Sequence, residues 1–247
     1  MARWIAGMDG CRGRWATALL DLDAPGTYAV RLVASPAEVL DGAEAPLAVG
    51  IDIPIGLPDR VGRGRSADLA ARAFLGRHAS VFPVPGRAAV YAADYEEAKR
   101  LSRETTDPPF APSIQLWNIL PYVRQVDGLL RARPALAGRL HEVHPEVAFH
   151  RLNGDRALDA PKKGPRRVEG LAQRRRLLLA EGLPPGLVEA RLPGVPADDH
   201  LDSLAALVVA RDLVAGRAMP LPDPFERDAH GLPVVIWAPA PRGSLAP

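Results

Sequence analysis

The sequence predicts an α/β domain built on a mixed sheet, in which three antiparallel strands precede parallel strands joined by helical crossovers. Two apolar runs, at residues 4–9 and 14–20, flank a short polar turn, as in a β-hairpin. A third short strand is expected at 27–33. The run at 47–54 is apolar without alternation, which is typical of a strand buried on both faces of a sheet.

Helix-start signals separate these strands from the rest of the chain. Ser35, Pro36 and Glu38 combine a cap, a proline at the first helical position and a capping-box glutamate, so a helix to about residue 41 is expected. Asp94 and Ser113 are expected to cap two further helices. Later elements are a strand near 140–143, a helix carrying Arg174 to Arg176, a helix at about 198–215 and an edge strand at 234–237.

Length and composition narrow the class of protein. We expect one domain over residues 1–247, with a helical and loop-rich elaboration at about 54–139 after the fourth strand. The 31 basic residues nearly balance the 29 acidic ones, so no overall charge implies a nucleic-acid or membrane partner. A single cysteine excludes an intramolecular disulfide framework. With no signal-peptide pattern and no apolar run near 20 residues, we expect a cytoplasmic protein that does not bind membranes.

Four aspartates follow the order of the predicted elements. Asp9 ends the first strand, Asp52 ends the fourth, and Asp199 and Asp202 project from one side of the last helix. In this topology strands one and four are neighbours and the last helix packs across them, so the four carboxylates can converge. Clustered carboxylates repel one another unless a cation compensates, and oxygen-only ligands favour Mg²⁺ or Mn²⁺. Two such ions about 4 Å apart would clamp a phosphodiester and activate the attacking water.

Other interpretations of these acids stay open. An Asp at a strand end is often only a turn residue, and Asp198 is expected to be a helix cap. On a strand, Glu142, His144 and Glu146 would share one face. Either Glu146 would then be a fifth catalytic acid or His144 a proton-transfer group, or the three residues form a hydrogen-bonded strand-to-loop corner.

Basic residues supply candidate substrate contacts. Arg12 and Arg14, in the hairpin after Asp9, are placed to reach a substrate phosphate. Further basic residues could line a groove for a phosphate backbone or form a solvated face: Arg65, Arg72, Arg77, Lys162, Lys163, Arg166, Arg167 and Arg174 to Arg176. The chain has few aromatic residues on which bases could stack.

Five motifs together resemble the DUF429 family, a set of predicted nucleases with a ribonuclease H-like fold. They are Gly7-Met8-Asp9-Gly10-Cys11-Arg12-Gly13-Arg14-Trp15, Gly50-Ile51-Asp52-Ile53-Pro54-Ile55-Gly56-Leu57, Ser80-Val81-Phe82-Pro83, Glu142-Val143-His144-Pro145-Glu146 and Asp198-Asp199-His200-Leu201-Asp202-Ser203-Leu204. The end of the last motif is also similar to the last helix of RuvC-type Holliday-junction resolvases. The resemblance implies a metal-dependent phosphodiesterase with Asp9, Asp52, Asp199 and Asp202 as its acids.

The sequence therefore predicts a divalent-metal-dependent nuclease that acts on nucleic acid, with a homodimer as one possible assembly. One alternative is a non-catalytic module that binds nucleic acid or a protein partner on the same fold. An ATP-binding phosphotransferase of the actin and sugar-kinase type would need a second, duplicated domain, and no second Asp-Gly-x-x-Gly hairpin is present. DNA, RNA, a branched junction and a small phosphoester all remain open as substrates.

Overall fold

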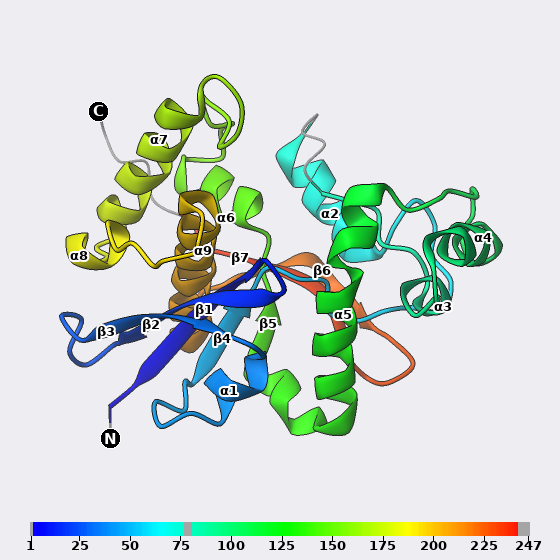
Figure 1. Ribbon diagram of the computed structural model, residues 1–247, viewed down its shortest axis with the longest axis horizontal. Coiled ribbons are helices and arrows are strands. Elements are labelled where there is room, and N and C mark those ends of the chain that lie inside the picture. Colours follow the sequence, from blue (N-terminus) through cyan, green and yellow to red (C-terminus); the bar gives the residue numbers. More distant parts are fainter. Residues whose placement is uncertain (1, 77–80, 242–247) are drawn as a thin grey trace. The chain divides into compact units, whose positions relative to one another are not determined.

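The computed structural model describes residues 2–76 and 81–241 and contains a five-stranded mixed sheet in the order β3-β2-β1-β4-β5. The strands are β1 (Trp4–Cys11), β2 (Arg14–Asp21), β3 (Tyr28–Val33), β4 (Ala48–Ile51) and β5 (Leu140–Glu142). β1, β2 and β3 are antiparallel, whereas β4 runs parallel to both β1 and β5. This sheet and its flanking helices form the ribonuclease H-like α/β arrangement, which confirms the predicted fold class (Figure 1).

The first hairpin has a two-residue turn. Arg12 and Gly13 adopt φ values of 50° and 79°, as a type I′ turn requires at both central positions. Because β1 continues to Cys11, Asp9 lies inside the strand and opposite Ala16, not at the strand end as expected. Asp9 nevertheless directly follows the last residue of β1 that pairs with β4.

Contacts within the chain divide it into two compact units. The first comprises residues 1–52, 138–219 and 237–247, and the second comprises 53–137 and 220–236. The elaboration expected at 54–139 falls almost entirely in the second unit, which also includes the later segment. Each unit is described separately below.

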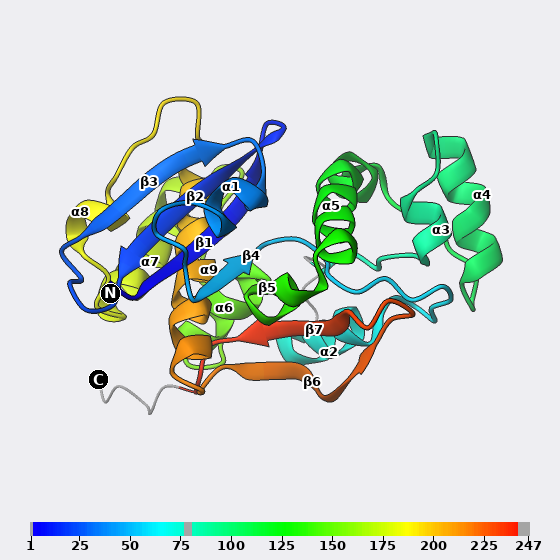
Figure 2. The ribbon, with the colours of Figure 1, turned by 90° about the horizontal axis from the view of Figure 1, so that it is seen from below.

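In the first unit, helix α9 (Ala197–Val214) lies across β1, β2 and β4 (Figure 2). The helices α6 (Pro145–Leu152) and α7 (Arg167–Ala180) pack against α9. Because α9 is covered by the sheet and by other helices, most of its residues are buried, including Leu204, Leu207 and Val208. Two short helices complete this unit: α1 (Pro36–Leu40) and α8 (Pro185–Val188).

Two glycines allow α9 to approach the sheet closely. A Cβ at Gly7 of β1 would lie 2.0 Å from the carbonyl oxygen of Ser203, and one at Gly50 of β4 would lie 2.4 Å from that of Ala206. Neither position can carry a side chain without displacing the α9 backbone. Since Asp9 and Gly7 share one face of β1, this approach brings the first turns of α9 beside Asp9.

The second unit contains α2 (Ser66–Leu75), α3 (Arg87–Val90), α4 (Tyr95–Thr105) and α5 (Ile114–Ala132), followed by a short 3₁₀ helix at Pro134–Gly138. The predicted caps are confirmed. Asp94 accepts a hydrogen bond from the Glu97 amide at 2.8 Å, and Ser113 accepts one from the Leu116 amide at 3.1 Å.

A two-stranded sheet of β6 (Met219–Arg227) and β7 (Pro233–Ala238) lies mostly in this unit. The expected edge strand at 234–237 is therefore β7, which pairs with β6 and not with the main sheet; Trp237 alone forms an isolated bridge to Val143. The motif residue Ser80 and the basic residue Arg77 lie outside the described residues. Within 2–76 and 81–241, no helix combines the length and apolarity needed to cross a membrane.

Two local expectations are wrong. β5 ends at Glu142, and Pro145 occupies the first turn of α6, so Glu142, His144 and Glu146 do not share one strand face. A proline fits the first turn of a helix, where its missing N–H is not needed, and it starts the helix here. Helix α9 begins at Ala197 after Pro196, so Asp198 lies within the first turn instead of capping it; Asp198 pairs with Arg167 at 3.5 Å.

Candidate metal centre

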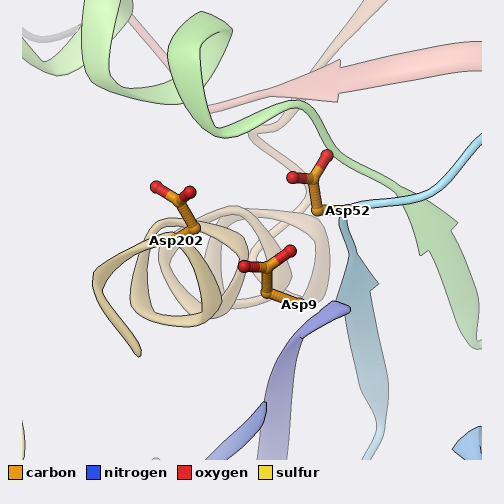
Figure 3. A group of neighbouring side chains, drawn as sticks. All are labelled: Asp9, Asp52 and Asp202. Atoms are coloured by element: carbon orange, nitrogen blue, oxygen red, sulfur yellow. The ribbon is translucent and has the colours of Figure 1, made fainter. Parts of the chain in front are cut away.

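Three of the predicted acids meet at one end of β1 and β4. Asp9 projects from β1, Asp52 directly follows β4, and Asp202 projects from α9 (Figure 3). One carboxylate oxygen from each residue lies within 4.8 Å of the others. Asp9 and Asp202 are buried and Asp52 is partly buried. We call these three residues the acidic triad.

The triad is electrostatically strained as it stands. Burial, followed by the nearby charges of Asp52 and Asp202, raises the pKa of Asp9 well above its usual value. Burial and the Asp202 charge raise the pKa of Asp52 to about 8, and burial also raises the pKa of Asp202. Three ionised carboxylates in this position therefore need a neighbouring cation.

Lys162 is one such cation. Its Nζ makes a short contact with Oδ2 of Asp202 and lies 3.7 Å from Oε1 of Glu146. Burial lowers the pKa of Lys162, but the Asp202 and Glu146 carboxylates outweigh it and raise this pKa above its usual value. Lys162 is therefore a fixed positive charge on one side of Asp202.

Glu146, the predicted fifth acid, lies on the first turn of α6 and is held by an arginine. Nη2 of Arg174 lies 2.7 Å and 3.0 Å from its two carboxylate oxygens. Arg174 is almost completely buried, and its guanidinium lies over the Phe149 ring. Burial raises the pKa of Glu146, but the charges of Lys162 and Arg174 lower it by more. The net shift is downward, and the carboxylate stays ionised.

Asp199 does not join the triad, although it lies one turn from Asp202 on α9. Its carboxylate is within hydrogen-bonding reach of the Cys11 thiol, and burial raises the pKa of Asp199. Burial and the hydrogen bond to Asp199 raise the pKa of Cys11 to about 12, so this cysteine is a protonated thiol. His200 points elsewhere, with its Nε2 3.0 Å from the Leu187 carbonyl oxygen.

The predicted substrate-binding residues have different surroundings. Arg12 and Lys163 are exposed, and Arg14 is exposed with one donor on the Leu32 carbonyl oxygen. Arg72 donates to the carbonyl oxygens of Val81 and Arg63 within the second unit.

Arg65 does not suit a role in substrate binding. Its side chain is inaccessible, and its guanidinium binds Asp68 and the carbonyl oxygens of Ile55 and Gly56. A guanidinium that is buried and paired cannot present donors to a substrate phosphate, so we remove Arg65 from the candidate set.

The pairing of Lys162 with Asp202 and of Arg174 with Glu146 was not foreseen from the sequence. Lys162 lies in a basic, turn-rich stretch and Arg174 lies on a basic helix. Basic residues in such segments usually form a solvated face. The partners are 40 and 28 residues distant along the chain, and no local spacing signals either pair.

The acidic triad fits a divalent ion. Oδ1 of Asp202 is buried and has no hydrogen-bond partner among the described residues, so it lacks the compensation that Oδ2 receives from Lys162. The donor set consists only of carboxylate oxygens, which suits Mg²⁺ or Mn²⁺ better than zinc.

Comparison with known families returned one match. The family model described as "Protein of unknown function (DUF429)" matches residues 7–227, a range that includes all three triad residues. No curated protein and no solved structure matched the chain.

Proposed function

The chain belongs to the DUF429 family, and we propose that it is a divalent-metal-dependent hydrolase of phosphodiester bonds, a nuclease. The observation that carries the proposal is the acidic triad, with three carboxylate oxygens within 4.8 Å of one another and an Oδ1 on Asp202 that has no partner within residues 2–76 and 81–241. Such a cluster is costly to maintain for structural reasons alone, because burial and neighbouring carboxylates raise the pKa values of Asp9 and Asp52.

Asp9, Asp52 and Asp202 would hold the ion, which is Mg²⁺ or Mn²⁺ on the basis of the donor set. A bound ion of this kind supplies Lewis-acid activation of water and neutralises charge that develops on the phosphate. The chain provides rigid support for these ligands, since Asp9 lies within a paired strand and Asp202 on a helix fixed against Gly7.

Nucleic acid is the substrate class that this chemistry and the nearby cations favour. Arg12 lies in the turn between β1 and β2, Arg14 is the first residue of β2, and Lys163 is exposed next to Lys162. We assign these residues to phosphate binding, where they would position the scissile bond against the triad. Asp199 and Glu146 have supporting roles: Asp199 lies beside Cys11, and Glu146 fixes Lys162 and Arg174.

The test is a cleavage panel over single-stranded, duplex, hybrid and branched nucleic acids with Mg²⁺ or Mn²⁺. The proposal requires cleavage of at least one substrate, its loss in EDTA and its loss in Asp9→Asn. Turnover that survives EDTA, or an Asp9→Asn variant with the wild-type rate, would contradict it. Binding of nucleic acid without turnover under all conditions would favour the non-catalytic module.

A further inference from the structure

The two sides of the Asp202 carboxylate have different partners. Oδ2 contacts the ammonium group of Lys162, whereas Oδ1 is buried without a partner among the described residues. Asp202 lies beside Asp9 and Asp52 in the acidic triad (Figure 3), and Lys162 neutralises only one of its two oxygens. A second ion at Asp202 would have to bind Oδ2 and would therefore displace Lys162.

Lys162 is held firmly where it lies. Its Nζ is also 3.7 Å from Glu146, and Glu146 is fixed in turn by both of its contacts with the buried Arg174. The carboxylate of Glu146 keeps Lys162 in place. Because the charge of Glu146 is already balanced by Arg174, Lys162 still presents a positive charge to Asp202.

The two other acids predicted to act at this site, Asp199 and Glu146, are engaged with other groups. Asp199 lies outside the triad, with its carboxylate near Cys11, and Glu146 is taken by Arg174 and Lys162. The ionised triad carries three negative charges, and Lys162 offsets one of them. A single divalent cation neutralises the other two.

We propose that this chain binds one divalent ion, not the two expected from the sequence, and that the Lys162 ammonium permanently takes the place of the second cation. This inference rests on the proposed function and makes it more specific. In two-ion phosphodiesterases the second ion holds the scissile phosphate and its leaving oxygen. Lys162 would supply that positive charge here as a point charge held between Asp202 and Glu146.

The experiment counts bound ions without measuring turnover. EDTA-treated full-length protein is titrated with Mn²⁺ at about pH 8.5, above the pKa of Asp52, by calorimetry and by the paramagnetic resonance of free Mn²⁺. The expected stoichiometry is one ion per chain. Two ions per wild-type chain would overturn the inference and leave the proposed function standing, whereas no bound ion would overturn both.

Variants of Lys162 test its role directly. Lys162→Met removes the charge and keeps the length of the side chain, so it should lower the Kd of the first Mn²⁺ by at least ~10-fold, because a nearby positive charge no longer repels the ion. Lys162→Arg keeps the charge and should retain one ion with wild-type affinity. Lys99→Met, on α4 in the second unit where Lys99 pairs with Glu96, is the matched control and should bind one Mn²⁺ with the wild-type Kd.

A Kd for Mn²⁺ in Lys162→Met equal to or weaker than that of the wild type would overturn the role of Lys162, even if one ion binds. Circular dichroism of each variant establishes that the fold is intact. The wild-type stoichiometry remains decisive if Lys162→Met does not fold.

Discussion

The carbonyl oxygen of Ser203 in α9 lies 2.0 Å from the position that a Cβ would take at Gly7 of β1. Only a glycine permits this contact between helix and strand. Asp9 is two residues from Gly7 in sequence, and Asp202 directly precedes Ser203. The absence of a side chain at Gly7 therefore sets how closely the carboxylates from β1 and α9 can approach.

Gly7→Ala should displace α9 from β1. The new methyl group would meet backbone atoms of both Ser203 and Leu207, which cannot move aside as a flexible side chain can. We expect the free energy of unfolding to fall by about 3 kcal/mol, at the upper end for overpacked cores, together with weaker Mn²⁺ binding. Urea denaturation measures the change. Gly26→Ala is the control, since nothing lies within 4 Å of a Cβ there; equal stability of the two variants would contradict the account.

Asp9→Asn should stop cleavage and stabilise the metal-free protein. The substitution removes a buried charge that faces Asp52 and Asp202, so the melting temperature in EDTA should rise while activity falls. The loss of activity should be at least about 100-fold, because even residues that only orient metal ligands cost 10- to 100-fold. Thermal denaturation and a cleavage assay provide the two measurements.

Asp94→Asn is the matched control for Asp9→Asn. Asp94 caps α4, and asparagine caps helices equally well, so neither stability nor activity should change. A metal-free Asp9→Asn protein less stable than the wild type would show that the Asp9 carboxylate has a structural role that the raised pKa does not indicate.

The stability of the metal-free protein should depend on pH. The pKa values of Asp9, Asp52 and Asp202 are all raised in the folded state, that of Asp52 from 3.8 to about 8. The folded protein thus holds these protons more tightly than the unfolded chain does. Their contribution to stability is present below about pH 4 and is lost as the pH rises through about 8.

Melting temperatures measured in EDTA between pH 5 and 9 test this pH dependence. Each kcal/mol of folding stability corresponds to about 2–4 °C for a chain of this size. Mg²⁺ or Mn²⁺ should restore stability mainly at the alkaline end, where the carboxylates are free to bind. Asp52→Asn should flatten the profile. A wild-type profile in EDTA that is as flat as that of Asp52→Asn would refute the explanation.

Arg174→Met should be strongly destabilising, whereas Arg176→Met should not. Arg174 is buried and binds both oxygens of Glu146, and loss of one partner of a buried pair costs about 3–5 kcal/mol. Arg176 is exposed on the same helix, and such surface changes stay within about 0.5 kcal/mol. Chemical denaturation of both variants measures the contrast, and similar values would mean that the pair with Glu146 does not support the fold.

Much of the fold could be predicted because the relevant signals are local. The apolar runs before Asp9 and Asp52 define β1 and β4, and the caps at Asp94 and Ser113 depend on hydrogen bonds over three residues. The sheet order follows once these strands are placed. Three of the four aspartates predicted to converge therefore do lie together.

The elements that were missed lack such local signals. β6 contains Pro220, Pro222 and Pro224, which cannot donate to a ladder and therefore disguise a strand. Glu142, His144 and Glu146 were considered as residues of one strand, whereas Pro145 begins α6. Asp199 was grouped with Asp202 because their spacing puts both side chains on one side of the helix. Residues three apart on a helix still differ in direction by about 60°, and this difference directs the Asp199 side chain toward Cys11.

The central claim is that Asp9, Asp52 and Asp202 jointly bind a divalent ion. Anomalous diffraction from crystals soaked in Mn²⁺ tests it most directly, because the scattering locates the ion independently of activity. We expect a peak about 2 Å from one carboxylate oxygen of each triad residue, including Oδ1 of Asp202, with Lys162 still on Oδ2. No Mn²⁺ peak at the triad, or one held by other residues, would contradict the account.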